Sequence, residues 1–249
     1  MKQLSFEVAA ARYTYALPEN WAEITPLQLR HYVADGGFSN RMIERLLDLS
    51  PVVAACLAPA DWWWLRRELD YLRDPTGIST QLLPELKVDG IGTLYGYNAD
   101  FTDVSWVEWC YADTYAARGR WDVVTATLYR PQRTDYNGET DRRVPFSKYG
   151  TENRLAAIAR LDDLTLQTIR LLYLALRHRL TDHYPHLFPP RDTDTKAAPS
   201  ASAPTDWLTI IRNAMGDHFH EEAKYMALPV PSVLFQLERR IKENQHSAK

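Results

Sequence analysis

The segment "LTLQTIRLLYLALRHRL", residues 164–180, constrains the fold more than any other part of the sequence. Its large apolar side chains alternate at spacings of three and four residues, in the series Leu166, Ile169, Tyr173, Leu176 and Leu180. Because an α-helix has about 3.6 residues per turn, this spacing places the whole series on one face. The segment therefore predicts a long helix that packs this face against a core.

Other helix boundaries can be predicted from residues that cap or begin helices. Thr25 precedes Pro26, and Gln28 follows three residues after Thr25, which is the pattern of a capping box with proline in the first turn. We expect a helix to begin there, and we expect Asp61 to be the N-cap of another. Apolar side chains at helical spacing predict further helices within residues 39–50, 102–119 and 120–130.

Two segments show features that are typical of β-hairpins. Apolar side chains alternate with polar ones in two short runs near the N-terminus, which are Leu4, Phe6 and Val8, and then Tyr13, Tyr15 and Leu17. Residues 9–12 are expected to join these two strands. In residues 85–98, the dipeptide Asp89-Gly90 supplies the positive φ angles that a tight turn needs, and so predicts a second hairpin.

The predicted organisation is a mainly α fold with one or two small β-hairpins and a C-terminal helix pair. Residues 1–187 are expected to form a helical body that includes the N-terminal hairpin. Residues 188–205 are rich in Pro, Ala and Ser, and are expected to form a flexible linker. Residues 206–249 are then expected to form two helices, from Asp206 to about Tyr225 and from Pro231 to about Asn244.

The segment "MGDHFHEEAKYM", residues 215–226, carries the sequence's densest group of potential metal ligands. On a helix, however, His218 and His220 are two residues apart and point in nearly opposite directions, so they cannot share a metal ion. The residue four positions after His220 is Lys224, which also excludes the zinc-protease pattern HExxH. We therefore expect these histidines to be structural.

A second group of histidines leaves one enzyme hypothesis open. A metal-dependent hydrolase could use His183, His186 and Glu222, but it would need a bound transition metal in fixed geometry. Histidines close to a helix C-terminus are also expected simply because they complement its partial negative charge. The sequence favours a protein that is not an enzyme and that needs no cofactor or metal.

Residues 131–150 form a long polar segment in which basic and aromatic side chains alternate. Arg142 and Arg143 could contact phosphates while neighbouring rings stack on bases, which is a mode of nucleic-acid binding. Acidic residues in the same segment cancel much of its charge. The segment is therefore interpreted as a loop that binds a protein partner, or that is disordered in isolation, rather than as one that binds nucleic acid.

Aromatic residues make up 12% of the sequence, including 8 Trp and 14 Tyr. Large rings fill cores, but they are also enriched at protein interfaces. Trp63 and Trp64 fall outside the apolar stripe of their predicted helix, so at least one of them is expected on a second packed face or at the surface. The residues predicted to contact a partner are Trp63, Trp64, Trp106, Trp109, Tyr136, Phe146, Tyr149, Leu234, Leu237 and Ile241.

Composition limits the other classes of partner. The net charge of -3 gives no overall field that would attract nucleic acid or an anionic membrane. No run reaches 18 apolar residues, and the N-terminus lacks the apolar core of a signal peptide. Cys56 and Cys110 are expected to be buried free thiols. We therefore expect a cytoplasmic protein that does not enter a membrane.

The order of several segments resembles a known family. These segments are "LPENWAEITPLQL" (residues 17–29), "VVTATLYRPQR" (123–133), "VPFSKYG" (144–150) and "GDHFHEEAKYMALPVPSVLFQLERR" (216–240). In this order the chain resembles tail assembly chaperone-like proteins of bacteriophages and prophages, especially those of Bacteroidota. The resemblance implies a non-enzymatic protein in the cytoplasm of the bacterial host. It would bind the tape measure protein, or another tail protein, and keep it soluble while the tail tube is assembled.

A structural component of the virion or of its head–tail connector is the alternative. Such a protein would remain in finished particles, whereas a chaperone would be absent from them. The sequence does not determine the oligomeric state.

Overall fold

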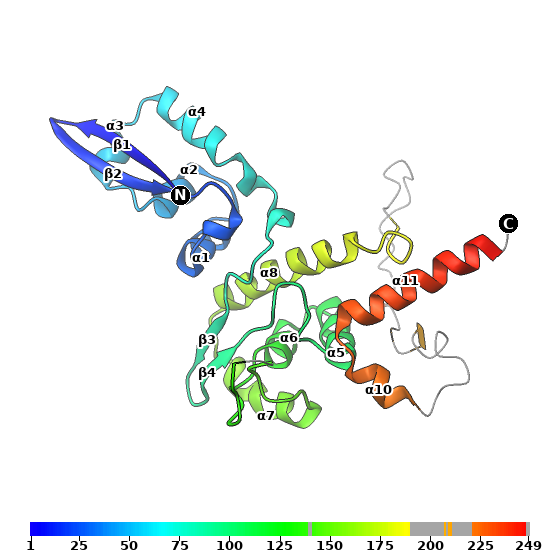
Figure 1. The fold of residues 1–249 in the computed structure, drawn as a ribbon. Helices are drawn as coiled ribbons and strands as arrows, with labels where there is room; N and C mark the ends of the chain where they lie inside the picture. The colour runs from blue at the N-terminus through cyan, green and yellow to red at the C-terminus, as the bar shows by residue number, and fades with distance from the viewer. Residues whose placement is uncertain (139–140, 190–206, 208, 211–220, 248–249) are drawn as a thin grey trace. The chain divides into compact units, whose positions relative to one another are not determined.

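The computed structural model describes residues 1–138, 141–189, 207, 209, 210 and 221–247, and shows a mainly α fold with two small antiparallel sheets (Figure 1). The predicted fold class is confirmed, including the C-terminal helix pair. The longer helices are α1 (Pro26–Ala34), α2 (Asn40–Leu46), α3 (Pro51–Cys56), α4 (Pro59–Glu68), α5 (Trp106–Ala117), α6 (Trp121–Leu128), α7 (Lys148–Ile158), α8 (Asp163–Asp182), α10 (Glu222–Ala227) and α11 (Val230–Ser247). The strands are β1 (Lys2–Val8), β2 (Ala11–Leu17), β3 (Glu85–Val88) and β4 (Gly92–Tyr95), and short 3-10 helices lie at Trp21–Glu23, Asp70–Arg73 and Pro75–Gly77.

The chain divides into two compact units. Unit 1 contains residues 1–83 and 162–176, and unit 2 contains residues 84–161 and 177–249. Helix α8 therefore contributes its first part to unit 1 and its last turns to unit 2. The predicted body, residues 1–187, supplies residues to both units.

The N-terminal hairpin has the predicted faces but a tighter turn. Strands β1 and β2 pair from Lys2 with Leu17 to Val8 with Ala11, so only Ala9 and Ala10 remain in the turn. Their φ angles are +51° and +67°. This is the left-handed region, in which a residue with a Cβ is disfavoured. The expected joining segment of residues 9–12 was therefore two residues too long.

Capping explains where α1 and α4 begin. The Thr25 side chain accepts a hydrogen bond from the Gln28 N–H, and the Gln28 side chain accepts one from the Thr25 N–H, which confirms the predicted capping box. The prediction that Asp61 is an N-cap is wrong. Helix α4 begins at Pro59, whose fixed φ suits the first turn, and Asp61 accepts a hydrogen bond from the Ala58 N–H at 2.8 Å.

The core of unit 1 is formed by the inward faces of its helices. On α4 and the turn after it, Leu65, Leu69 and Leu72 are fully buried, and their spacing of three and four residues places them on one face. Trp21 packs edge-on against Tyr32 and Tyr71, with ring centroids 5.3 and 6.1 Å away. The other fully buried residues of this core include Leu29, Met42, Ile43, Val53, Ile78 and Leu172.

Unit 2 is built around α5, which packs against α6 and α10, and α6 packs in turn against α7. The second predicted hairpin, β3–β4, is present, and Gly90 in its turn has a φ of +83°. Trp106 and Trp109 of α5 are fully buried and stack on each other at 5.0 Å. Helix α5 is therefore central to this unit.

Helix α7 begins inside the segment 131–150, which the sequence assigned to a loop, and continues beyond it to Ile158. Ser147 caps it by accepting a hydrogen bond from the Gly150 N–H at 3.0 Å. A Cβ at Gly150 would lie only 2.8 Å from the Ser147 oxygen, so glycine allows this close approach. The buried side of α7 includes Thr151 and Arg154, and this polar character hid the helical pattern.

The C-terminal helices dock on the N-terminal end of α5. The Trp106 N–H donates to the Leu228 carbonyl at 2.8 Å, and the Val230 N–H donates to the Val104 carbonyl at 3.0 Å. The predicted second helix, from Pro231 to about Asn244, is confirmed with bounds of Val230–Ser247. Most of the predicted linker and residues 211–220 of the first predicted helix lie outside the described residues.

Trp207 fills an aromatic cluster in unit 2. Its ring lies 4.8 Å from Trp109 and 5.6 Å from both Trp106 and Phe188. Its Nε1 donates a hydrogen bond to Asp113 at 2.9 Å. This contact anchors the chain that follows the predicted linker to α5.

Within the part of the chain that the structure describes, no helix has the length and apolar character needed to cross a membrane. The two cysteines are free thiols. Cys110 is buried as expected, but the expectation was wrong for Cys56, which is exposed because the short helix α3 buries only Val53.

Candidate functional site

A cleft of about 540 Å³ opens in unit 2 beside the first turns of α5. One side is formed by α10 and another by the segment that precedes α7. Its floor is charged and its walls are largely apolar. The residues that line it are Asp103, Ser105, Val107, Glu108, Arg130, Arg133, Asp141, Arg143, Pro145, Phe146, Ala223, Met226 and Ala227.

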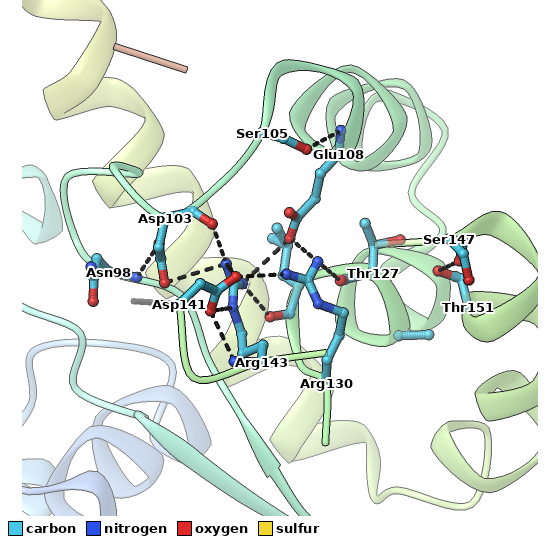
Figure 2. A network of polar contacts seen from close by, with 12 residues as sticks. Asn98, Asp103, Ser105, Glu108, Thr127, Arg130, Asp141, Arg143, Ser147 and Thr151 are labelled. Atoms are coloured by element: carbon cyan, nitrogen blue, oxygen red, sulfur yellow. Dashed lines mark hydrogen bonds and ion pairs between the residues drawn. The ribbon is translucent and has the colours of Figure 1, made fainter. Parts of the chain in front are cut away.

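Glu108 is the buried carboxylate at the centre of the floor. It lies in the first turn of α5, where the helix dipole favours negative charge, and its N–H donates to the capping Ser105 hydroxyl at 3.4 Å. Its side chain points away from the helix toward two arginines (Figure 2). A buried carboxylate in such a position needs a charged partner.

Arg143 is the first of these partners, and its side chain is 0% exposed. Its Nη1 lies 3.3 Å from Glu108 and donates to the Leu128 carbonyl at 2.9 Å. Its Nη2 donates to the Asp103 carbonyl at 2.7 Å. Arg143 therefore ties the segment after β4, the end of α6 and the loop before α7 to one another.

Arg130 is the second partner and is equally buried. Its Nη1 lies 2.5 Å from Glu108, and its Nη2 lies 3.1 Å from Asp141. Asp141 also accepts hydrogen bonds from the Nε and the backbone N–H of Arg143 (Figure 2). The Arg130 Nε is buried and has no hydrogen-bond partner among the described residues.

The electrostatics of the floor reflect burial as much as pairing. Burial raises the pKa of the Glu108 carboxyl, although Arg143 and Arg130 act in the opposite direction. Burial also raises the pKa of Asp103, against the attraction of Arg143. For Arg143, burial disfavours the charged form, but the three carboxylates outweigh it and raise its pKa. The Arg143 guanidinium group therefore stays charged and holds the carboxylates in place.

This arrangement is suited to holding a loop rather than to breaking bonds. The carboxylates and guanidinium groups of the floor are engaged with one another and with backbone carbonyls. Among the described residues that line the cleft there is no histidine or cysteine, and Ser105 is used as a helix cap. A ligand in the cleft would contact its apolar walls and the exposed edges of its charged side chains.

The other arginines of the polar loop are also engaged by the protein. Arg142 stacks on Tyr95, with 3.5 Å between its guanidinium carbon and the ring centroid, and lies 3.3 Å from Glu85. Arg133 is paired with Asp135 at 2.7 Å. Of the two arginines that the nucleic-acid hypothesis used, Arg143 is inaccessible and Arg142 is half-exposed.

The ten residues predicted to contact a partner fall into two groups. Those inside the protein are Trp106, Trp109, Leu234 and Leu237, which pack in the core of unit 2 and expose almost no surface. Those that reach solvent fully or in part are Trp63, Trp64, Tyr136, Phe146, Tyr149 and Ile241. Helix α11 thus packs against unit 2 through Leu234 and Leu237.

The histidines of the hydrolase hypothesis have structural partners. His186 Nδ1 lies 2.7 Å from Glu238, which also accepts the Leu187 N–H at 2.9 Å. His183 Nδ1 lies 2.7 Å from the Arg179 carbonyl. The described residues contain no group of three or more His, Cys, Asp or Glu that could hold a metal ion. His218 and His220 lie outside the described residues.

Sequence reasoning missed the charged floor, although one signal was present. Glu108 lies four residues from both Val104 and Ala112, inside an apolar face of the helix that the sequence predicts within residues 102–119. A glutamate in that position implies a buried basic partner. Which arginine supplies it could not be read from the sequence, because Arg143 reaches Glu108 only after the loop folds back.

Comparison with protein-family models, curated proteins and solved structures gives no match to this chain.

Proposed function

We propose that this protein is a non-enzymatic tail assembly chaperone that binds the tape measure protein of a phage or prophage in the host cytoplasm. The observation that carries the proposal is the exposed indole ring of Trp63. A chaperone for a helical client must expose an apolar surface while its own hydrophobic core stays packed.

Trp63 lies on the outer side of α4. Trp63 is 62% exposed, whereas Leu65 of α4 and Leu69 at the end of the helix are fully buried. The Arg67 guanidinium lies 5.6 Å from the Trp63 ring centroid. Tryptophan and arginine are both among the residue types that are enriched in binding hot spots. The ring is therefore available to a partner without any change in the core of unit 1.

The charged floor of unit 2 supports a binding role rather than a chemical one. Its groups hold Arg143 against Asp141, Leu128 and Asp103, so the surface beside these residues is held in one shape. A preorganised surface loses less conformational entropy when it binds.

Co-expression with the tape measure protein of the same phage or prophage tests the proposal. We expect the chain to increase the soluble fraction of the tape measure protein and to co-purify with it. Trp63→Ala should weaken the complex about thirtyfold if Trp63 is a hot spot worth about 2 kcal/mol. Leu27→Ala is the matched control, because Leu27 is 63% exposed on α1 of the same unit.

The outcomes separate the proposal from its alternative. If the tape measure protein is equally insoluble with and without the chain, the chaperone function is wrong. If the chain is found in stoichiometric amounts in purified finished particles, it is a structural virion or connector protein instead.

A further inference from the structure

Helix α5 has a second apolar side that the protein covers only in part. Val107, Tyr111 and Tyr115 follow one another at a spacing of four residues, so they share one side of the helix. All three are half-buried, while Trp106 and Trp109 on the other side are fully buried. One apolar side of α5 therefore forms the core and the other remains open to a partner.

Rings from α5 and from the segment before α7 form a continuous track. The Tyr111 ring centroid lies 4.8 Å from that of Tyr115 and 5.6 Å from that of Phe146. Phe146 and Val107 in turn line the cleft together with Met226 of α10. We call these five residues the α5 track. From Val107 to Tyr115 it runs about 12 Å along the helix axis.

Two cations flank the track. The Lys148 Nζ lies 5.9 Å from the Tyr111 ring centroid, and the Arg118 guanidinium carbon lies 5.5 Å from that of Tyr115. Both residues are exposed. Among the described residues neither has a carboxylate within ion-pair distance, in contrast to Arg133 and Arg142 in the nearby loop. The track therefore presents apolar rings with these two cations beside them, and Glu152, whose charge acts on the Tyr111 hydroxyl, adds one carboxylate nearby.

We propose that the α5 track binds an amphipathic helix that carries apolar side chains along one face and carboxylates beside them. A helix presents side chains at spacings of three and four residues, which matches the rise between Val107, Tyr111 and Tyr115. Its carboxylates meet Lys148 and Arg118. The flexible Met226 side chain lets the cleft accept one apolar side chain of varied shape.

This inference rests on the proposed function for the identity of the partner, a helical segment of the tape measure protein. The binding chemistry can be tested without that identity. Two synthetic helical peptides serve as probes. They share the same leucines at helical spacing, and their flanking positions are all glutamate in one and all lysine in the other.

Binding of each labelled peptide to the full chain is measured by fluorescence anisotropy. We expect the glutamate peptide to bind more tightly than the lysine peptide. Lys148→Glu and Arg118→Glu should each weaken the glutamate peptide by about threefold to tenfold, since an exposed ion pair is replaced by repulsion. The control is Arg160→Glu, because Arg160 is also exposed in unit 2 and its guanidinium lies beside Gly90 in the turn between β3 and β4.

Tyr115→Ala tests the apolar part of the track and should weaken the same peptide about tenfold or more. Circular dichroism and the urea midpoint show whether this variant is folded, and Tyr115→Phe, which keeps the ring, should retain binding. This pair of variants keeps the result interpretable if the alanine variant unfolds.

Equal binding of the two peptides, or equal losses for Arg160→Glu and Lys148→Glu, would overturn the inference. So would binding of a single-stranded oligonucleotide that is lost in Lys148→Glu while the glutamate peptide fails to bind, since the track would then be a nucleic-acid surface. If the tape measure protein is kept soluble equally well by Lys148→Glu, Arg118→Glu and the wild type, the inference fails while the proposed function stands. If the glutamate peptide binds but the tape measure protein stays insoluble, the proposed function fails and the track stands as a binding surface.

Discussion

Replacing Arg143 by methionine should destabilise unit 2 strongly, while the same change at the neighbouring Arg142 should not. Methionine keeps much of the length and volume of the side chain but removes its charge. In Arg143→Met, three carboxylates that face the guanidinium group would lose a common partner, and those carboxylates belong to Asp103, Glu108 and Asp141.

The size of the effect follows from burial. The Arg143 side chain is 0% exposed, and breaking a buried ion pair by removing one partner costs about 3–5 kcal/mol. The Arg142 side chain is 40% exposed, and its contacts with Tyr95 and Glu85 are those of a partly solvated surface group. Its removal should cost about 1 kcal/mol or less.

Equilibrium unfolding in urea, followed by tryptophan fluorescence, compares the two variants. With an m-value of about 3 kcal/mol/M, a loss of about 3 kcal/mol lowers the urea midpoint by about 1 M. Limited trypsin digestion gives a second readout, because freeing the loop should speed cleavage after Arg133 and Arg142. Both effects should be small or absent in Arg142→Met, apart from the loss of that cleavage site.

The deficit of Arg143→Met should also depend on pH. Burial raises the folded-state pKa of Glu108 and Asp103, and Arg143 opposes this, so its removal raises both further. A raised carboxyl pKa means that the folded state gains stability as pH falls through that pKa. The difference between variant and wild type should therefore be largest at neutral pH and shrink toward pH 4–5. Equal urea midpoints for the Arg143 and Arg142 variants would refute the reasoning.

Three further predictions concern other parts of the fold. Ala10→Gly should stabilise the N-terminal hairpin by up to about 1 kcal/mol, because φ is +67° at this position. Ala16→Gly within β2 should weaken the hairpin instead. Thermal unfolding that shows the same loss for both variants would contradict this prediction. Trp207→Ala should lower the free energy of unfolding in urea by about 3–5 kcal/mol, and Trp207→Phe by only about 1–2 kcal/mol. The phenyl ring keeps the packing against Trp109 but loses the hydrogen bond to Asp113. Equal losses for the two variants would contradict this prediction. Burial opposes the charge of Glu238, but hydrogen bonds from His186 and Leu187 outweigh this effect and lower the pKa of Glu238. The charged carboxylate therefore contributes its full stabilisation above the ordinary pKa of 4.5, and this contribution is lost as pH falls through the lowered pKa. Glu238→Gln should flatten that part of the pH–stability curve, and an unchanged curve would argue against the contact.

The elements that could be predicted from the sequence are those whose signals are local. The capping box at Thr25 and the apolar series of α8 depend only on residues within a few positions of one another, and both are confirmed. The alternation of the N-terminal hairpin was also local, but its turn was not. The pairing of the two strands holds Ala9 and Ala10 at positive φ. The sequence has no glycine or asparagine at these positions that would predict such a turn.

The features that could not be predicted depend on contacts between distant residues. The buried side of α7 carries Thr151 and Arg154, and Arg154 becomes a buried residue only because the Ala126 carbonyl accepts its hydrogen bonds. The apolar periodicity of residues 148–158, which form α7, was therefore too weak to predict a helix. In the same way, the polar loop gave no sign that Arg143 would be buried. Whether an aromatic residue such as Trp109 or Trp63 faces the core or solvent was also decided by packing.

Direct titration of the purified chain with the tape measure protein of the same phage or prophage tests the central claim most closely. Isothermal titration calorimetry should show a stable complex with a negative change in heat capacity, since apolar surface is buried, and Trp63→Ala should weaken it far more than Leu27→Ala. A folded chain that gives no binding heat and no co-elution with the tape measure protein would contradict the account.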